Sequence, residues 1–267
     1  MSNICLITGN HLRHVFFAKQ LISKGLVSSW VLEERENILP SAPTSIDDDL
    51  KSLFGHHFSE RDRIENLVFG PSAADFECRA PRLQVERHAL NDDATINFVA
   101  AHSPQLVISY GCHKLSPRFF QRLSARFWNV HGGLSPDYRG VATHFWPSYF
   151  LEPQMTGMTL HETTDFLDAG RIICQTAASM VAGDSLHRLA ARTVTEFSEQ
   201  LANKLTLLDF ENLPEGLVQK AYGKVFMVKD WRPEHLRLIY EVYDDSLVDA
   251  VLNGEIEGRS PNLISVI

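Results

Sequence analysis

Short apolar runs alternate with amphipathic stretches along the first part of the chain. Residues 4–8 form one apolar run, ICLIT, which a glycine and an asparagine follow. Residues 12–26 place Val15, Ala18 and Leu21 on one face at helical spacing, and residues 28–34 form a second apolar run. A strand, a helix and a second strand in succession predict a parallel α/β sheet.

The alternation resumes after a segment of mixed character. Residues 36–82 combine proline, serine, acidic and histidine residues, and they predict only one helix, within 59–70. Beyond this segment the pattern predicts helices at 93–102, 116–125, 143–152 and 185–210, and strands at 106–111, 127–132, 157–164 and 171–177. Ser185 stands where it can cap the longest of these helices.

The chain divides into a core and a shorter tail. With 44% hydrophobic residues, 267 residues suffice for one large core and a small appendage. The character changes after residues 213–216, LPEG, where a tail rich in aromatic and aliphatic residues begins. We therefore expect a catalytic core over residues 1–212 and a docked C-terminal extension over residues 213–267.

Charge and cysteine content narrow the functional classes. A net charge of −8 argues against a protein whose main function is to bind nucleic acid or an anionic membrane. The longest apolar runs are far too short for a membrane span. The four cysteines are scattered without metal-ligand spacing, so we expect reduced thiols, no metal and a cytoplasmic location.

Candidate chemistry gathers at the end of the strand within residues 127–132. Asn129 and His131 alternate onto the same side of that strand, and two glycines follow. Asp168 belongs to the connection between the strands at 157–164 and 171–177, so we expect it to join them at the carboxyl edge of a parallel sheet, where ligands bind. Singly, each residue has an ordinary structural explanation, but the set is more informative.

An amide, an imidazole and a carboxylate suit acyl transfer to an amine. Asn129 and a protonated His131 could hold the oxyanion of a tetrahedral intermediate. Asp168 could keep the imidazolium charged and carry a proton away from the amine. The sequence shows no GxSxG turn and no cysteine with an evident base other than His113 beside Cys112, so direct transfer is expected.

Two motifs resemble those of the 10-formyltetrahydrofolate-dependent formyltransferase family. The first is Asn129-Val-His131 with the LSPDYRG segment at 134–140, and the second is a Gly-x-Thr-x-His stretch leading to Asp-x-Gly-x-Ile and a glutamine. The second motif is matched by Gly157, Thr159, His161, Asp168, Gly170, Ile172 and Gln175. The resemblance runs to about residue 180, departs at Gly132-Gly133 and in residues 36–82, and implies a Rossmann-like α/β formyltransferase core with a mostly parallel sheet.

The resemblance also implies roles for particular residues. Asn129, His131 and Asp168 would be catalytic, 10-formyltetrahydrofolate would be the cosubstrate, and Cys112, His113, Leu115 and Thr164 would line its pocket, partly through backbone groups. His161 is interpreted as structural, and Tyr110 and Leu106 as core residues. A metal site at His56-His57 is disfavoured because no third ligand has useful spacing.

The length and composition of the C-terminal tail favour one class of acceptor. A short aromatic tail with more acidic than basic residues favours a sugar-nucleotide N-formyltransferase, as in lipopolysaccharide O-antigen biosynthesis. Formylation of glycinamide ribonucleotide or methionyl-tRNA, hydrolysis of 10-formyltetrahydrofolate, and a non-catalytic folate-binding module remain as alternatives. A homodimer is left open.

Two features could hold the nucleotide. Asn10, Arg13 and His14 follow the first strand at a helix N-terminus, which favours anions, although Arg13 and His14 could equally be ordinary surface residues. In the tail, Tyr222 and Trp231 could stack on a base, but core positions are the more usual place for such residues.

Overall fold

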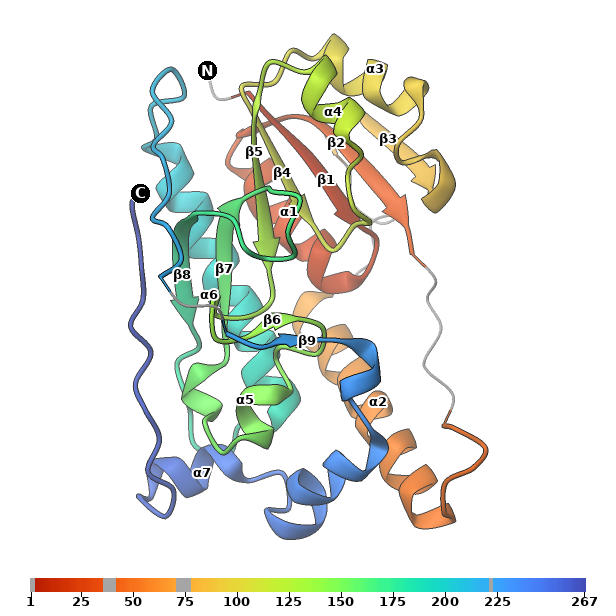
Figure 1. Ribbon diagram of the computed structural model, residues 1–267, viewed down its shortest axis with the longest axis vertical. Helices are drawn as coiled ribbons and strands as arrows, with labels where there is room; N and C mark the ends of the chain where they lie inside the picture. The colour runs from red at the N-terminus through yellow and green to blue at the C-terminus, as the bar shows by residue number, and fades with distance from the viewer. Residues whose placement is uncertain (1–2, 36–41, 71–77, 221–222) are drawn as a thin grey trace.

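The fold is described from a computed structural model, which describes residues 3–35, 42–70, 78–220 and 223–267. Its centre is a seven-stranded sheet in the order β3-β2-β1-β4-β5-β7-β8 (Figure 1). The strands are β1 (Ile4–Gly9), β2 (Val27–Glu34), β3 (Arg82–Glu86), β4 (Leu106–Tyr110), β5 (Arg126–His131), β7 (Gly157–Glu162) and β8 (Ile172–Ala177). A second, two-stranded sheet pairs β6 (Arg139–Gly140) with β9 (Val225–Phe226).

The sheet is parallel over its first five strands and antiparallel at one side. β1 pairs in parallel with β2 and β4, β2 with β3, and β4 with β5. β7 runs antiparallel to β5, and β8 antiparallel to β7. The expectation of a mostly parallel α/β sheet is confirmed.

Seven α-helices surround the described sheet. They are α1 (Leu12–Ser23), α2 (Asp48–Phe69), α3 (Asp93–Ala101), α4 (Pro117–Arg122), α5 (Trp146–Tyr149), α6 (Leu186–Thr206) and α7 (Leu247–Leu252). Single turns of 3₁₀-helix span Arg87–Ala89, Pro153–Met155, Val228–Asp230 and Pro233–His235, and a π-turn spans Leu238–Val242. Ser185 caps α6 as predicted, because its hydroxyl accepts a hydrogen bond from the Arg188 N–H at 3.2 Å.

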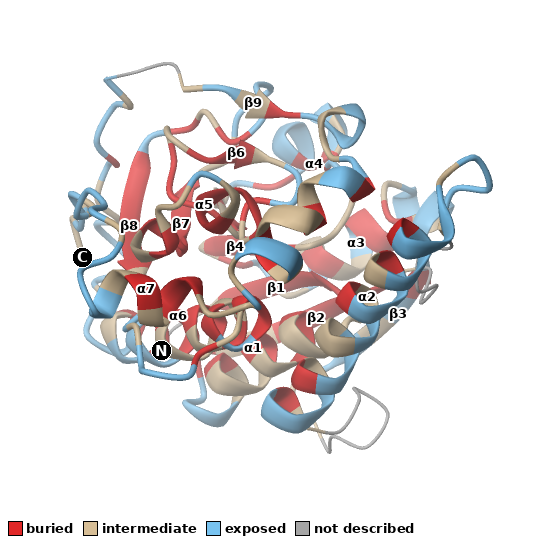
Figure 2. Ribbon diagram, turned by 90° about the horizontal axis from the view of Figure 1, so that it is seen from below, coloured by how far each residue is buried: buried red, intermediate tan, exposed pale blue. Residues whose placement is uncertain are grey.

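Alternation along β1 divides the core into two layers. Ile4 and Leu6 face the cluster that α1 and α6 complete, whereas Cys5 and Ile7 face the cluster beneath α3 and α4. Both layers are apolar, so the central strands are buried on both faces, as parallel strands usually are. Figure 2 shows the strands buried and the outer faces of the surrounding helices exposed.

The segment that the sequence left largely unplaced supplies α2, and β3 begins where this segment ends. The helix predicted within 59–70 begins much earlier, at Asp48, and ends before Gly70, whose φ of 67° takes the left-handed region. α2 packs on α1 and α6. β3 escaped prediction because it is an edge strand of alternating polar residues, RLQVE, of which only Val85 is buried.

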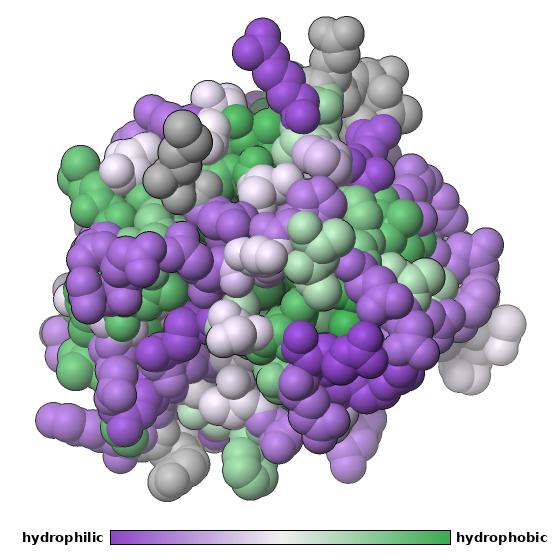
Figure 3. Space-filling model, turned by 90° about the horizontal axis from the view of Figure 1, so that it is seen from above, coloured by the Kyte–Doolittle hydropathy of each residue, from purple (hydrophilic) through white to green (hydrophobic). Residues whose placement is uncertain are grey.

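The C-terminal extension packs along the core. β9 pairs with β6, and the Val266 N–H donates to the Ile173 carbonyl at 2.9 Å beside β8. The helix predicted at 143–152 is shorter than expected, because α5 covers only four residues. No helix in the described ranges is long and apolar enough to cross a membrane. From the end where α3 and α4 lie, polar side chains surround small groups of hydrophobic ones (Figure 3).

Candidate active site

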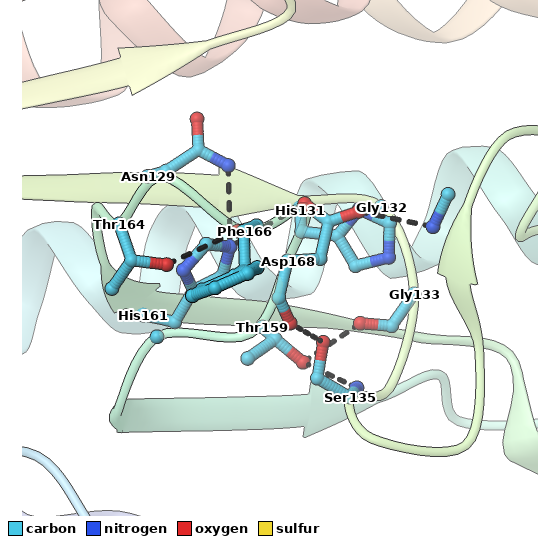
Figure 4. Close-up of polar contacts among 12 residues, drawn as sticks. Asn129, His131, Gly132, Gly133, Ser135, Thr159, His161, Thr164, Phe166 and Asp168 are labelled. Atoms are coloured by element: carbon cyan, nitrogen blue, oxygen red, sulfur yellow. Dashed lines mark hydrogen bonds and ion pairs between the residues drawn. The ribbon is translucent and has the colours of Figure 1, made fainter. Parts of the chain in front are cut away.

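Asn129 and His131 leave β5 on the same face, as the alternation predicts. Asn129 lies directly opposite His161 in the antiparallel β5–β7 register, and its Nδ2 is 3.3 Å from His161 Nε2 (Figure 4). The Ser109 hydroxyl donates to Asn129 Oδ1 at 2.8 Å. Because that oxygen is engaged by the neighbouring strand, the amide presents its N–H groups to the site.

Asp168 reaches this face by another path than the one expected. Because β7 is antiparallel to β5, the β7–β8 loop starts at the amino end of β5, where the Thr163 N–H donates to the Phe127 carbonyl. The expectation that this connection lies at the carboxyl edge of parallel strands is therefore wrong. The loop folds back over the sheet, and Asp168, with a φ of 48°, completes the bend.

The carboxylate of Asp168 joins the two histidines. Its Oδ2 lies 3.4 Å from His131 Nδ1 and accepts a hydrogen bond from the Gly140 N–H at 3.0 Å, while its Oδ1 lies 3.5 Å from His161 Nε2. All three side chains are buried. The structure thus brings together the three predicted catalytic residues and adds His161, which the sequence suggested only as structural.

Protonation states follow from burial and charge. Burial lowers the pKa of His131 below its ordinary value, although Asp168 and the Tyr138 carbonyl, 2.8 Å from Nε2, act in the opposite direction. Burial raises the pKa of Asp168, but His131 and His161 outweigh it and leave that pKa below the usual range. The resting pair is therefore a neutral imidazole and a carboxylate, not the imidazolium that we expected from the sequence.

The surroundings of His131 suit a general base more than a group that is already protonated before the reaction. Both ring nitrogens of His131 face acceptor oxygens, so a proton that arrives there meets partners already in place. The imidazole can accept a proton from an attacking amine, and the amide of Asn129 can donate to a developing oxyanion.

Two further motif residues hold the turn after His131. Gln175 Nε2 donates to the Ser135 carbonyl at 2.7 Å and to Thr159 Oγ1 at 3.1 Å. The Thr159 hydroxyl in turn donates to the Gly133 carbonyl at 2.7 Å and accepts from the Ser135 N–H at 3.0 Å. Their place in the second motif was the signal for this supporting role.

The loop expected to line the folate pocket follows β4 and contains Cys112, His113 and Leu115. Fully buried Glu33, at the end of β2, accepts from the His113 N–H at 2.9 Å and lies 2.6 Å from its Nδ1. Cys112 is half-buried, and burial raises the pKa of its thiol to about 12, which makes it a poor nucleophile. Leu115 packs into the core under α3 and α4, so only its backbone is available to a ligand.

The β7–β8 loop faces this loop. Lys114 Nζ donates to the Asp165 carbonyl at 3.1 Å and ties the two loops together. Thr164 is exposed and donates to the Phe166 carbonyl at 3.1 Å, and the Phe166 ring is 78% exposed. Lys114 thus brings the loop of Cys112 and His113 next to the loop that carries Thr164.

The residues of the predicted anion turn take different partners in the structure. The side-chain Oδ1 of Asn10 accepts from the Arg35 N–H at 2.9 Å, and Arg13 pairs with Glu65 of α2 at 2.6 Å. His14 is buried against Tyr110, so its interpretation as a surface residue is wrong. The ring occupies space that a Cβ on Gly9 or Gly111 would fill, which explains the two glycines.

His131 also lines a cavity of about 410 Å³. Its walls come from α1, α2, the turn after β5, the start of α6 and the C-terminal extension. They include Arg13, His14, His57, Phe58, Arg61, Glu65, His131, Thr143, His144, His187 and Trp231. Sequence reasoning missed the α2 contribution, because nothing in residues 36–82 shows that this segment faces His131. Tyr222 lies outside the described residues.

His57 is not a metal ligand in this arrangement. Its Nδ1 lies 2.9 Å from the Tyr240 hydroxyl, and its ring packs on His187. In the described part of the chain no group of three or more His, Cys, Asp or Glu residues is arranged to hold a metal ion.

Comparison with known proteins places this geometry in context. Residues 50–205 match the formyl transferase family. Over 108 residues the chain is 33% identical to the phosphoribosylglycinamide formyltransferase of Escherichia coli (strain K12), a match that covers 39% of this chain and 50% of that protein. The matched region thus spans half the length of this curated relative.

Solved structures share the fold at low sequence identity. Phosphoribosylglycinamide formyltransferase from Anaplasma phagocytophilum aligns with a TM-score of 0.53 and 20% identity over 85% of this chain and 98% of that one. WlaRD, a sugar 3N-formyl transferase, aligns with a TM-score of 0.50 and 18% identity over 87% of this chain and 72% of that one.

Proposed function

Because the chain belongs to the formyl transferase family, we propose that it moves a formyl group from 10-formyltetrahydrofolate to the amine of a nucleotide-linked amino sugar. One observation carries the proposal. His131 lines a cavity of about 410 Å³, and its partner Asp168 belongs to the β7–β8 loop, which Lys114 ties to the loop of Cys112 and His113. Acceptor and folate can then bind on neighbouring parts of the molecule and meet at this imidazole.

The residues divide the chemical work. The acceptor amine attacks the formyl carbon, a C–N bond forms, and the carbonyl oxygen becomes an oxyanion to which the Asn129 amide donates. For this the Asn129 Nδ2 exchanges its contact with His161 for the substrate. Neutral His131 takes the proton that the amine loses, and Asp168 stabilises the imidazolium that results.

Collapse of the intermediate completes the transfer. The bond between the formyl carbon and N10 of the folate breaks, and the proton on His131 passes to N10. The products are a formamide and tetrahydrofolate, and His131 returns to its neutral form. No covalent enzyme intermediate is needed, and both buried thiols and half-buried Cys112 stay out of the reaction.

Two kinds of acceptor have support. The aromatic and cationic walls of the cavity suit a base and a phosphate, and WlaRD was solved in the presence of dTDP and 5-N-formyl-THF. The Escherichia coli relative instead favours glycinamide ribonucleotide as a second candidate. The cytoplasmic location and the role in O-antigen biosynthesis stay predictions, and a homodimer stays open.

The test compares acceptors under one set of conditions. With saturating 10-formyltetrahydrofolate, kcat/KM is measured for a panel of nucleotide-linked amino sugars, glycinamide ribonucleotide and initiator methionyl-tRNA. We expect the highest value for one of the amino sugars. A higher value for either other acceptor overturns the sugar assignment but keeps the transfer chemistry, and folate binding without transfer or hydrolysis would identify a binding module instead.

A further inference from the structure

Helix α2, which the sequence left without a role, forms one wall of the cavity beside His131. We propose that Arg61 of α2 and Arg13 of α1 together bind the phosphate of the acceptor. The inference rests on the proposed function, because it takes this cavity as the place where the acceptor binds.

The two arginines line the same cavity. Arg13 lies in the first turn of α1 and Arg61 lies in the second half of α2, two helices that pack against each other (Figure 1). Both side chains line the same cavity as His131. A phosphate held between them would therefore leave the rest of the acceptor within the cavity that His131 also borders.

The two arginines differ in whether a carboxylate balances their charge. Arg13 is paired with Glu65 at 2.6 Å, whereas Arg61 has no carboxylate within salt-bridge distance among the described residues. The Arg61 guanidinium instead lies 4.8 Å from the centre of the Phe58 ring. Burial, and then the charge of Arg13, lower the pKa of Arg61, and they outweigh the opposing charges of Glu65 and Asp62.

The histidines of the cavity do not change this balance. Burial lowers the pKa of His57 to about 2 and those of His144 and His187 to about 4, so these rings are neutral near pH 7. Two guanidinium groups and one carboxylate then leave one net positive charge among the residues that line the cavity, in a chain of net charge −8. The residues that line the cavity thus carry a net positive charge in a chain that is negative overall, which favours an anion.

The remaining walls fit what a phosphate would be attached to. Buried His187 Nε2 has no hydrogen-bond partner among the described residues and can bond to a hydroxyl group of the ligand. Phe58 and half-buried Trp231 add flat apolar surfaces from α2 and from the C-terminal extension. A nucleotide-linked sugar contains a phosphate, hydroxyl groups and an aromatic base, and the cavity offers a matching group for each of them.

Arg61→Ala tests the assignment, and Arg63→Ala is its matched control. Arg63 is on the same helix, but it is exposed and paired with Glu60 at 2.7 Å. Loss of a charge-assisted contact with phosphate should raise the acceptor KM about tenfold to a hundredfold in Arg61→Ala, with the folate KM unchanged. Arg61→Lys should recover part of the loss, whereas Arg63→Ala should behave as wild type.

A binding assay keeps this test separate from the proposed function. Inorganic pyrophosphate should raise the melting temperature of the wild-type protein and of Arg63→Ala, but not of Arg61→Ala. This result would support the anion site even if none of the tested acceptors were formylated. Equal protection of Arg61→Ala, no protection of the wild type, or a normal acceptor KM in Arg61→Ala would each overturn the assignment of Arg61.

Discussion

At the scale of single residues, the site depends on how His131 is surrounded. The imidazole is buried, and oxygens of Tyr138 and Asp168 stand 2.8 and 3.4 Å from its two nitrogens. Asn129, held by Ser109 and His161, supplies the neutral donor. Asp168 also contacts His161, and His161 contacts Asn129, so these side chains should act as one unit.

Single substitutions in this unit should therefore be severe and far from additive. Asn129→Ala, His131→Ala and Asp168→Ala should each lower kcat about a hundredfold or more, because each removes an interaction made in the transition state. The triple variant should be little slower than the worst single one. Steady-state kinetics measure this, with circular dichroism as the control for folding, and near-normal kcat in His131→Ala would refute the mechanism.

The pH dependence of the reaction should report His131. Because burial lowers its pKa, the neutral base persists below the ordinary imidazole value of about 6.5, and the acid limb of kcat should lie below that pH. Asp168 raises the pKa of His131, so Asp168→Asn should move the limb to still lower pH. Profiles of kcat at saturating substrates, with NMR titration of the histidines as a check, measure both shifts. A pKa of His131 above 6.5 in the NMR titration would contradict the assignment.

Glu33 should control the folate loop from outside the site. Its buried carboxylate holds both the backbone N–H and the ring of His113. Glu33→Gln keeps the shape but loses the charge-assisted contacts, so we expect the folate KM to rise about tenfold while kcat changes less. Exposed Glu34→Gln is the control. Equal folate KM values in the two variants would exclude this role.

At the scale of elements, the β7–β8 loop decides where Asp168 stands. The loop folds back tightly, and a Cβ on Gly170 would collide with the Glu162 carbonyl and approach His161. The alternating apolar pattern located β7 and β8, but their antiparallel direction depends on pairing across the sheet.

Gly170→Ala should therefore act on catalysis through the backbone. The loop must shift to admit the methyl group, and a displacement of about 1 Å at Asp168 can cost roughly a hundredfold in rate. We expect kcat to fall at least tenfold. The control is Gly55→Ala in α2, where a Cβ meets open space and should raise helix stability by about 1 kcal/mol without changing kcat. Wild-type kcat in Gly170→Ala would show that the loop tolerates the shift.

At the scale of the whole molecule, buried neutral histidines should make the fold sensitive to acid. Burial lowers the pKa of His57 to about 2 and those of His144 and His187 to about 4, so the unfolded chain binds more protons than the folded one below pH 6.5. Each group then removes about 1.4 kcal/mol of stability per pH unit between about pH 6.5 and 4. Asp245, whose pKa burial raises to about 6, offsets one of the three.

Urea unfolding at a series of pH values measures this loss. The free energy of unfolding should fall steadily from pH 6.5 to pH 4.5, and His144→Asn should reduce the slope by about one proton. Exposed His88→Gln should leave the slope unchanged. A free energy of unfolding that is constant over this range would show that the histidines are protonated in the folded protein.

The α/β class, most central elements and three candidate catalytic residues follow from the sequence alone. These depend on local patterns: apolar runs, helical periodicity, and a motif in which Asn129 and His131 share a strand face. The sequence also located Asp168, although for the wrong structural reason.

How distant segments meet depends on the tertiary structure. The polar edge strand β3, the neutral state of His131, the different partners of Asn10 and Arg13 and the placement of Arg61 in the cavity wall all depend on burial and packing. Periodicity reports which face of a helix is apolar, but not which partner that face meets. Burial arises from contacts far apart in the sequence, so protonation and the shape of the cavity could not be read from local patterns.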